Sequence, residues 1–370
     1  MDRNPIKILE SLGQSIWLDY IRRDLISSGR LQRLIEEDGL SGLTSNTSIF
    51  EKSIAESNLY DTDIQGLSIA TKDFNAIYEA ISQQDLQNAA DLFRPLYEKS
   101  NGGDGYVSLE VNPHLAYDTL GTIEEGYRLW ATMNRPNILI KVPATVEGIP
   151  AIRQLISEGI NVNVTLLFSL QRYRQVADAF IAGIKDRINK GKSPKNIVSV
   201  ASFSLSRLDT QIDPKEVDFV ASGGGKSYFE AKIRGQVAIS IAKIAYKIYR
   251  QIFESEEFLR LGALPQRLLW ASTTPQNPDY SDLKYVEALI GPNTVHTITL
   301  KILEAYRDRG KPESLLEVNL EEASLVWSKL SDAGINMIEI TEKLESNGVE
   351  EFIQSYNKMI GVLSKKTRIY

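Results

Sequence analysis

The strongest candidate for a catalytic residue in this sequence is Lys141, because it stands inside an apolar run. Residues 137–150 read NILIKVPATVEGIP, so the lysine follows Ile140 and precedes Val142. An ammonium group is costly to bury unless it is paired or loses its proton. A lysine that points toward the axis of a barrel can present a free amine, which is the group that forms a Schiff base with a ketone. The alternative is a lysine at the end of a strand that reaches solvent.

The composition removes several other kinds of catalytic site. The 370 residues include no cysteine, which excludes disulfides, thiolate zinc sites and cysteine nucleophiles. Only two histidines occur, His114 and His296, so a His-rich metal site is excluded and a Ser-His-Asp triad has few candidates. We expect both histidines to have structural roles, His114 at the start of a helix and His296 in a strand.

Charge and hydropathy limit the partners and the location. The net charge is −6 and no block of basic residues occurs, which argues against binding to nucleic acid or to an anionic membrane. No apolar run reaches the ~18 residues that a membrane helix needs. The N-terminus, MDRNPIKILE, lacks the apolar core of a signal peptide, so the sequence predicts a cytoplasmic protein.

Short apolar stretches alternate with stretches of helical periodicity along the chain. The predicted strands are 15–20, 40–46, 106–111, 137–142, 160–168, 197–205, 267–272 and 294–299. The predicted helices are 21–37, 49–57, 63–99 with Asp85 as an N-cap, 113–133, 147–157, 169–189 capped by Ser169, 216–254 with a break at 222–225, and most of 305–370.

Eight strand–helix units of this kind predict a parallel sheet with right-handed crossovers. Closed on itself, such a sheet is an α/β fold, the (β/α)8 TIM barrel, whose active site lies at the carboxyl ends of the strands. We expect one barrel domain over residues 1–370, with additional N-terminal and C-terminal helices and a C-terminal helical extension at about 311–370.

Polar side chains stand near the carboxyl ends of several predicted strands, and a barrel would bring them into one cavity. They are Asp19, Asn46, Glu110, Lys141, Asn163, Thr165, Ser202 and Arg207. This convergence favours a catalytic Lys141 over one that reaches solvent.

Each partner of the lysine has a structural alternative when it is taken alone. Asp19 could be a helix N-cap and Glu110 a salt-bridge residue at a strand end. Arg207 could pair with Asp209 or Asp213.

The segments that carry these residues resemble the transaldolase family, and more closely its longer bacterial subgroup. The resemblance covers about residues 10–310 in the same order, through GLTSNTSIF (42–50), DGYVSLEVNPHLAYDT (104–119), NILIKVPATVEGIPAI (137–152), NVNVTLLFSLQRY (161–173), VASFSLSRLD (200–209), LLWAST (268–273) and GPNTVHT (291–297). It implies a (β/α)8 barrel enzyme of the pentose phosphate pathway with no metal or organic cofactor. Such an enzyme moves a dihydroxyacetone unit from fructose 6-phosphate or sedoheptulose 7-phosphate to an aldose phosphate.

The same resemblance implies a role for each matching residue. Lys141 is similar to the Schiff-base nucleophile, and Asp19 to the acid/base that takes the proton from the C4 hydroxyl. Glu110 and Thr165 resemble the pair that holds a catalytic water. The implied substrate contacts are Asn46 and Asn163 for hydroxyls and the enamine, and Ser202, Arg207 and Ser272 for phosphate.

Three departures from the family pattern bear on the substrate. The family usually has proline where this chain has Thr47, and ASTGxK where residues 271–276 read ASTTPQ. Thr274 thus replaces a glycine, which tolerates positive φ better than threonine does, and Gln276 replaces a lysine. These changes motivate an alternative, a divergent Schiff-base aldolase or transferase that acts on another sugar or a specialised metabolite.

Two further alternatives are a non-catalytic barrel that binds a partner and a pyridoxal-phosphate enzyme. The sequence leaves the oligomeric state open, with a homodimer as one option. It also does not decide whether residues 315–370 cover the cavity mouth or form a subunit interface.

Overall fold

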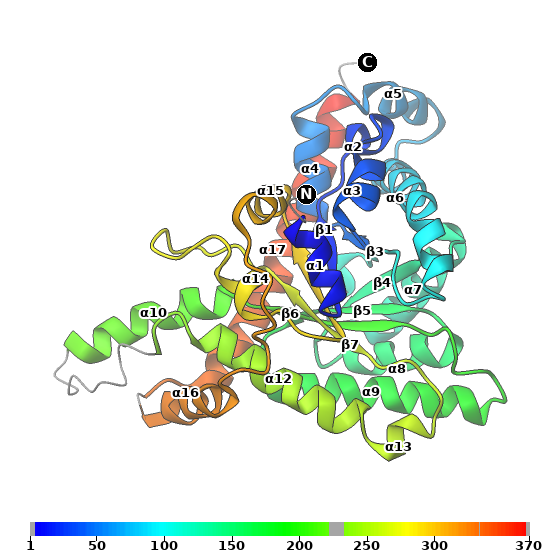
Figure 1. The fold of residues 1–370 in the computed structure, drawn as a ribbon. Helices are drawn as coiled ribbons and strands as arrows, with labels where there is room; N and C mark the ends of the chain where they lie inside the picture. Colours follow the sequence, from blue (N-terminus) through cyan, green and yellow to red (C-terminus); the bar gives the residue numbers. More distant parts are fainter. Residues whose placement is uncertain (1–3, 222–232, 333, 368–370) are drawn as a thin grey trace.

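A closed barrel of eight parallel strands forms the centre of the computed structural model, which describes residues 4–221, 233–332 and 334–367 (Figure 1). The strands pair in chain order, and β8 closes onto β1. They are β1 (Gln14–Asp19), β2 (Gly42–Thr44), β3 (Tyr106–Glu110), β4 (Ile138–Pro143), β5 (Val162–Leu167), β6 (Ser199–Ser204), β7 (Arg267–Ala271) and β8 (Thr294–Ile298). The predicted (β/α)8 barrel is therefore confirmed.

Helices surround the barrel and bury the outward faces of the strands, as the alternation of side chains in a strand requires (Figure 1). The helices of the surrounding layer are α3 (Arg30–Asp38), α6 (Phe74–Lys99), α7 (Thr119–Met133), α8 (Gly148–Glu158), α9 (Leu170–Asn189), α10 (Ser206–Ala221), α12 (Val237–Phe253) and α15 (Leu300–Arg309). Additional helices are α1 (Pro5–Ser11), α2 (Arg23–Ser27), α4 (Thr47–Ala55), α5 (Asp61–Ala70), η1 (Pro113–Leu115), α13 (Glu256–Leu259), α14 (Lys284–Ala288), α16 (Leu320–Asp332) and α17 (Met337–Lys366).

The inside of the barrel changes character along its axis. Buried apolar side chains fill the middle, among them Trp17, Tyr106 and Leu269. Below them, at the amino ends of the strands, Arg267 donates hydrogen bonds to Ser15 Oγ at 2.8 Å and to Asp104 Oδ1 at 3.2 Å. The polar positions at the carboxyl ends are therefore left to line a cavity, because the layers beneath them close the barrel.

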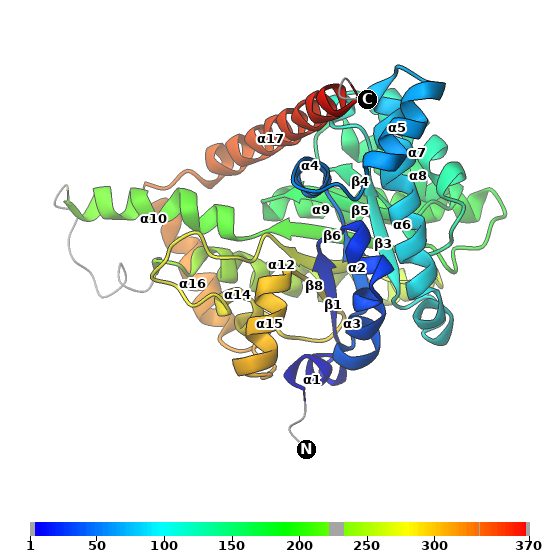
Figure 2. The same cartoon turned by 90° about the horizontal axis from the view of Figure 1, so that it is seen from above.

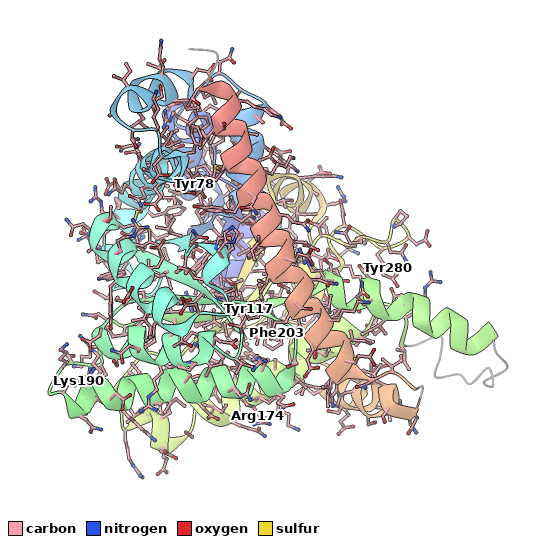
Figure 3. All side chains as sticks on the ribbon, turned by 180° about the vertical axis from the view of Figure 1, so that it is seen from behind. Tyr78, Tyr117, Arg174, Lys190, Phe203 and Tyr280 are labelled. Carbon is pink, nitrogen blue, oxygen red and sulfur yellow. The ribbon has the colours of Figure 1, made fainter. Side chains whose placement is uncertain are left out.

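Helix α17 crosses the carboxyl end of the barrel and packs against α4 and α6 (Figures 2 and 3). Its buried residues include Leu344, Val349, Met359 and Leu363, so one face of the helix is part of the core. Of the two roles left open for the C-terminal segment, the structure shows the cover over the cavity mouth.

Within the described residues, no helix combines the length and the apolar character needed to cross a lipid bilayer.

Some local predictions were wrong. Asp85 is not an N-cap but lies inside α6, where its buried carboxylate pairs with Arg23 at 2.9 Å, and Asp73 caps that helix. The helix predicted from residue 216 begins at Ser206 as α10. The predicted break at 222–225 lies outside the described residues. Ser169 caps α9 as expected, through a hydrogen bond from the amide of Arg172.

Candidate active site

A cavity of about 300 Å³ opens at the carboxyl ends of the strands, beneath α17. All nine residues singled out in the sequence line this cavity: Asp19, Asn46, Glu110, Lys141, Thr165, Asn163, Ser202, Arg207 and Ser272. They come from seven of the eight strands, β1 to β7, and from the segments that follow them, because in a parallel barrel every strand ends at the same rim.

Lys141 is the buried cation at the centre of the cavity and is only 8% exposed. It stands directly beside Glu110, since the register of β3 and β4 pairs these two residues. Its Nζ donates hydrogen bonds to Glu110 Oε1 at 2.6 Å and to the carbonyl oxygen of Ser45 at 2.7 Å. The lysine therefore does not reach solvent but is paired with a carboxylate that can accept its proton.

Asp19 ends β1 and is a second carboxylate in the same cavity. Thr44, its neighbour in register on β2, donates a hydrogen bond to Asp19 Oδ1 at 3.0 Å. Burial raises the pKa of Asp19 above its ordinary value, and the nearby Glu110 acts in the same direction, whereas Lys141 and the Thr44 hydroxyl oppose the rise. The N-cap alternative is wrong, because α2 begins at Arg23 with another residue as its cap.

A β-bulge displays Thr165 to the cavity. The register between β5 and β6 shifts between Val164 and Leu167, and the intervening Leu166 has a left-handed φ of 56°. The Leu166 side chain lies against Gly348 of α17. A Cβ atom added to Gly348 would be only 2.7 Å from Cδ2 of Leu166, so the close contact requires glycine at this position. The left-handed backbone of Leu166 is strained, and it lies beside the predicted catalytic Thr165. Functional sites often retain backbone strain of this kind.

Asn163 is fixed in the cavity by hydroxyl groups on either side. Ser202 Oγ donates to Asn163 Oδ1 at 2.6 Å, and Asn163 Nδ2 donates to Ser108 Oγ at 3.0 Å. The two bonds settle the orientation of the amide, so the remaining amide hydrogen of Asn163 is available to a ligand.

The start of α4 brings two further polar groups to the site. Asn46 caps this helix by accepting a hydrogen bond from the amide of Ile49 at 3.0 Å. Thr47, which stands where the family usually has proline, has its hydroxyl 3.4 Å from Glu110 Oε2. This departure therefore adds a hydrogen-bond donor to the carboxylate that binds Lys141.

Arg207 and Ser272 form the rim of the cavity. Arg207 lies in the first turn of α10 and pairs with Glu351 of α17 at 2.6 Å. The alternative of a pair with Asp209 or Asp213 is not the one observed; Asp209 instead binds Lys284 at 3.2 Å.

The ASTTPQ loop does not use the replaced glycine position for its turn. The left-handed residue is Ser272, with a φ of 52°, whereas Thr274 is not among the described residues with positive φ. Gln276 lines a neighbouring cavity together with Asp213 and Tyr280 rather than the central one.

Several cavity residues were not singled out in the sequence. Thr44 lies two residues before Asn46 and in register with Asp19, so the alternation of strand β2 could have identified it. The contributions of α17 are Glu351, Phe352 and Ser355. No local pattern places this helix over the barrel, because its position depends on packing across more than 200 residues of chain.

The two histidines have the expected places. His114 lies in the short η1 helix, and its ring is 2.9 Å from Asn357 Oδ1 of α17. His296 is fully buried in β8, and burial lowers its pKa to about 3, so its ring is neutral.

Comparisons with known proteins agree on one family. A family model described as transaldolase/fructose-6-phosphate aldolase matches residues 16–363. The chain is 43% identical to a transaldolase of Trichodesmium erythraeum, over 100% of this chain and 99% of the relative. It is 44% identical to a transaldolase of Thiobacillus denitrificans (96% and 99%) and 41% identical to one of Mycobacterium tuberculosis (97% and 96%).

Proposed function

The chain belongs to the transaldolase family, and from this premise we propose that it transfers a dihydroxyacetone unit between sugar phosphates through a Schiff base on Lys141. It is thus an enzyme of the transferase class, and the pathway is the pentose phosphate pathway. The donors are fructose 6-phosphate or sedoheptulose 7-phosphate, and the acceptor is an aldose phosphate. The comparisons give no support to the alternative of a divergent enzyme for another metabolite.

The first half of the reaction forms the imine. Lys141 Nζ gives a proton to Glu110 and attacks the C2 carbonyl of the ketose, which produces a carbinolamine. Glu110 returns a proton to the departing hydroxyl group, so that water leaves and a protonated imine remains. Thr165 orients this water, and after transfer the same water hydrolyses the imine.

The second half breaks and remakes one carbon–carbon bond. Asp19 accepts the proton of the C4 hydroxyl, the C3–C4 bond breaks, and its electron pair moves into the imine to form an enamine. The aldehyde product leaves. The enamine carbon then attacks the carbonyl of the incoming aldose, and Asp19 gives the proton to the new alkoxide.

Polar residues around the lysine hold the substrate. Asn46 and Asn163 bind its hydroxyl groups and the enamine, and Asn163 is preoriented by Ser202 and Ser108. Arg207 and Ser272 bind the phosphate at the rim, where a guanidinium suits bidentate contact. Ser202 of β6 is the third proposed phosphate contact, and its hydroxyl also orients Asn163.

The observation that carries this proposal is the Lys141–Glu110 pair in one cavity with Asp19. A cytoplasmic location and a homodimer stay predictions from the sequence. The domain division also stays a prediction: one domain over residues 1–370, with a helical extension from about residue 311.

A transfer assay tests the proposal. With fructose 6-phosphate and erythrose 4-phosphate, we expect sedoheptulose 7-phosphate and glyceraldehyde 3-phosphate in equal amounts. Lys141→Met should abolish the transfer. Lys243→Met is a matched control, because Lys243 is a lysine of similar burial (9% exposed) that lies in α12 and donates to the carbonyl of Val318. Equal rates on phosphorylated and unphosphorylated ketoses would contradict the proposed substrate class.

A further inference from the structure

We propose that Glu351 of α17 sets the affinity of this enzyme for phosphorylated substrates by competing with the substrate phosphate for Arg207. This inference rests on the proposed function, in which Arg207 is the phosphate contact. It adds a residue that was not singled out in the sequence and that belongs to the helix covering the cavity.

The geometry places a carboxylate on the guanidinium of Arg207. Arg207 and Glu351 are 2.6 Å apart, and both line the central cavity, together with Phe352 and Ser355 of the same helix. The side chains of Arg207 and Glu351 are 32% and 54% exposed, so a ligand in the cavity can reach the pair. A carboxylate and a phosphate bind a guanidinium through the same bidentate contact.

The other charges of the cavity leave phosphate little choice of partner. Among the described lining residues, the cations are Lys141 and Arg207, whereas Asp19, Glu110 and Glu351 carry carboxylates. Lys141 lies deep in the cavity and is paired with Glu110. A phosphate at the rim therefore depends on Arg207, and a carboxylate left beside it would repel the phosphate dianion.

The helix that carries Glu351 is held firmly at several points along its length. Glu345 pairs with Arg172 at 3.2 Å, and Lys358 pairs with the buried Glu51 at 3.1 Å. Near its C-terminal end, Lys366 pairs with Asp61 at 2.5 Å. With the backbone fixed in this way, Glu351 can leave Arg207 by turning its own side chain, without opening of α17.

This competition has a selective consequence. A phosphorylated ketose must displace Glu351 before it can bind Arg207, whereas an unphosphorylated ketose does not engage that contact. Partly exposed ion pairs contribute up to about 1 kcal/mol, so releasing Arg207 should strengthen phosphate binding about two- to fivefold. Glu351 therefore lowers affinity for the phosphate group while leaving the chemistry at Lys141 untouched.

Calorimetry with inorganic phosphate as the probe measures the competition without turnover. We compare the full-length wild type with Glu351→Gln, with Glu351→Ala as a second variant, and with Arg207→Gln. Glu350→Gln is the matched control, because Glu350 is the adjacent residue of α17, carries the same charge and accepts a hydrogen bond from Gln354 at 3.1 Å. Melting temperatures of all variants show whether each is folded.

We expect Glu351→Gln and Glu351→Ala to bind phosphate about two- to fivefold more tightly than wild type, Glu350→Gln to match wild type, and Arg207→Gln to bind more weakly. KM for fructose 6-phosphate should fall by the same factor in Glu351→Gln, with kcat and the KM for fructose unchanged. Glu351→Asp should restore part of the wild-type KM. Unchanged or weaker phosphate binding in both Glu351 variants would overturn the proposal, as would equal tightening in Glu350→Gln.

Failure of the proposed function would look different. In that case the wild type would show no transfer between sugar phosphates, whatever its affinity for inorganic phosphate. A wild type that catalyses transfer, combined with Glu351 variants that bind phosphate as wild type does, would overturn the Glu351 inference alone.

Discussion

The Nζ atom of Lys141 lies 2.6 Å from Oε1 of Glu110, because the register of β3 and β4 sets these two residues side by side. The pairing explains how a lysine can be buried in an apolar strand, since the carboxylate compensates the ammonium group. It also places a proton acceptor next to the group that must become a nucleophile.

Replacing Glu110 with glutamine should preserve the shape of the site but remove its proton acceptor. We expect kcat to fall about 10²–10⁴-fold, the range typical of losing general acid–base catalysis. Rapid-quench borohydride trapping should show slower formation of the adduct on Lys141. Glu51→Gln is the control, because it neutralises another buried carboxylate that pairs with a lysine of α17. An equal loss of activity in both variants would contradict a specific role for Glu110.

The raised pKa of Asp19 should define the acidic limb of the pH–rate profile. Asp19 has to be ionised to accept the hydroxyl proton, so kcat/KM should fall as the pH drops through its pKa, at higher pH than for an ordinary aspartate. Thr44→Val removes a hydrogen bond that lowers this pKa, so the limb should move to higher pH. A limb that stays in place, or that moves to lower pH, would show that another group is responsible.

Asp19→Asn should lose activity and gain stability at neutral pH. Because folding raises the pKa of Asp19, the folded state binds the proton more tightly than the unfolded state does. Ionised Asp19 therefore costs stability above its folded-state pKa, and this cost disappears as the pH falls below the unfolded-state value. Urea unfolding at several pH values should show a gain over wild type at pH 7 that shrinks in acid. A loss of stability at pH 7 would refute this reasoning.

Arg267 should matter for stability and not for catalysis, because it lies at the opposite end of the barrel from the cavity. It binds Ser15 and Asp104 there. Arg267→Met leaves the Asp104 carboxylate without its cation and should lower the free energy of unfolding by about 2–4 kcal/mol. Denaturant unfolding measures this loss. At a temperature where the variant is folded, kcat should equal that of wild type; a large change in kcat would contradict the separation of the two ends.

The barrel and the inner part of the site could be predicted from sequence because they depend on short-range patterns. The alternation of side chains along a strand places Glu110 and Lys141 on the inner face. Closure of the parallel barrel then brings the carboxyl ends of the strands together at one rim. Thr165 was singled out by the same alternation, but the bulge at Leu166 that displays it was not, because a left-handed leucine has no sequence signature.

The outer part of the site depends on contacts that local sequence does not encode. The structural alternative for Arg207 was an ion pair with a nearby aspartate, whereas its partner Glu351 comes from a helix 144 positions away in sequence. Asp85 illustrates the same limit: its type suits an N-cap, but tertiary pairing with Arg23 uses it inside a helix.

The most direct test of the central claim is borohydride trapping of the wild-type protein with fructose 6-phosphate, followed by mass mapping of the peptides. We expect a reduced adduct on the peptide that contains Lys141, and its absence in Lys141→Met. An adduct on another lysine, or none with any ketose, would leave the barrel in place and contradict the assignment of Lys141 as the nucleophile.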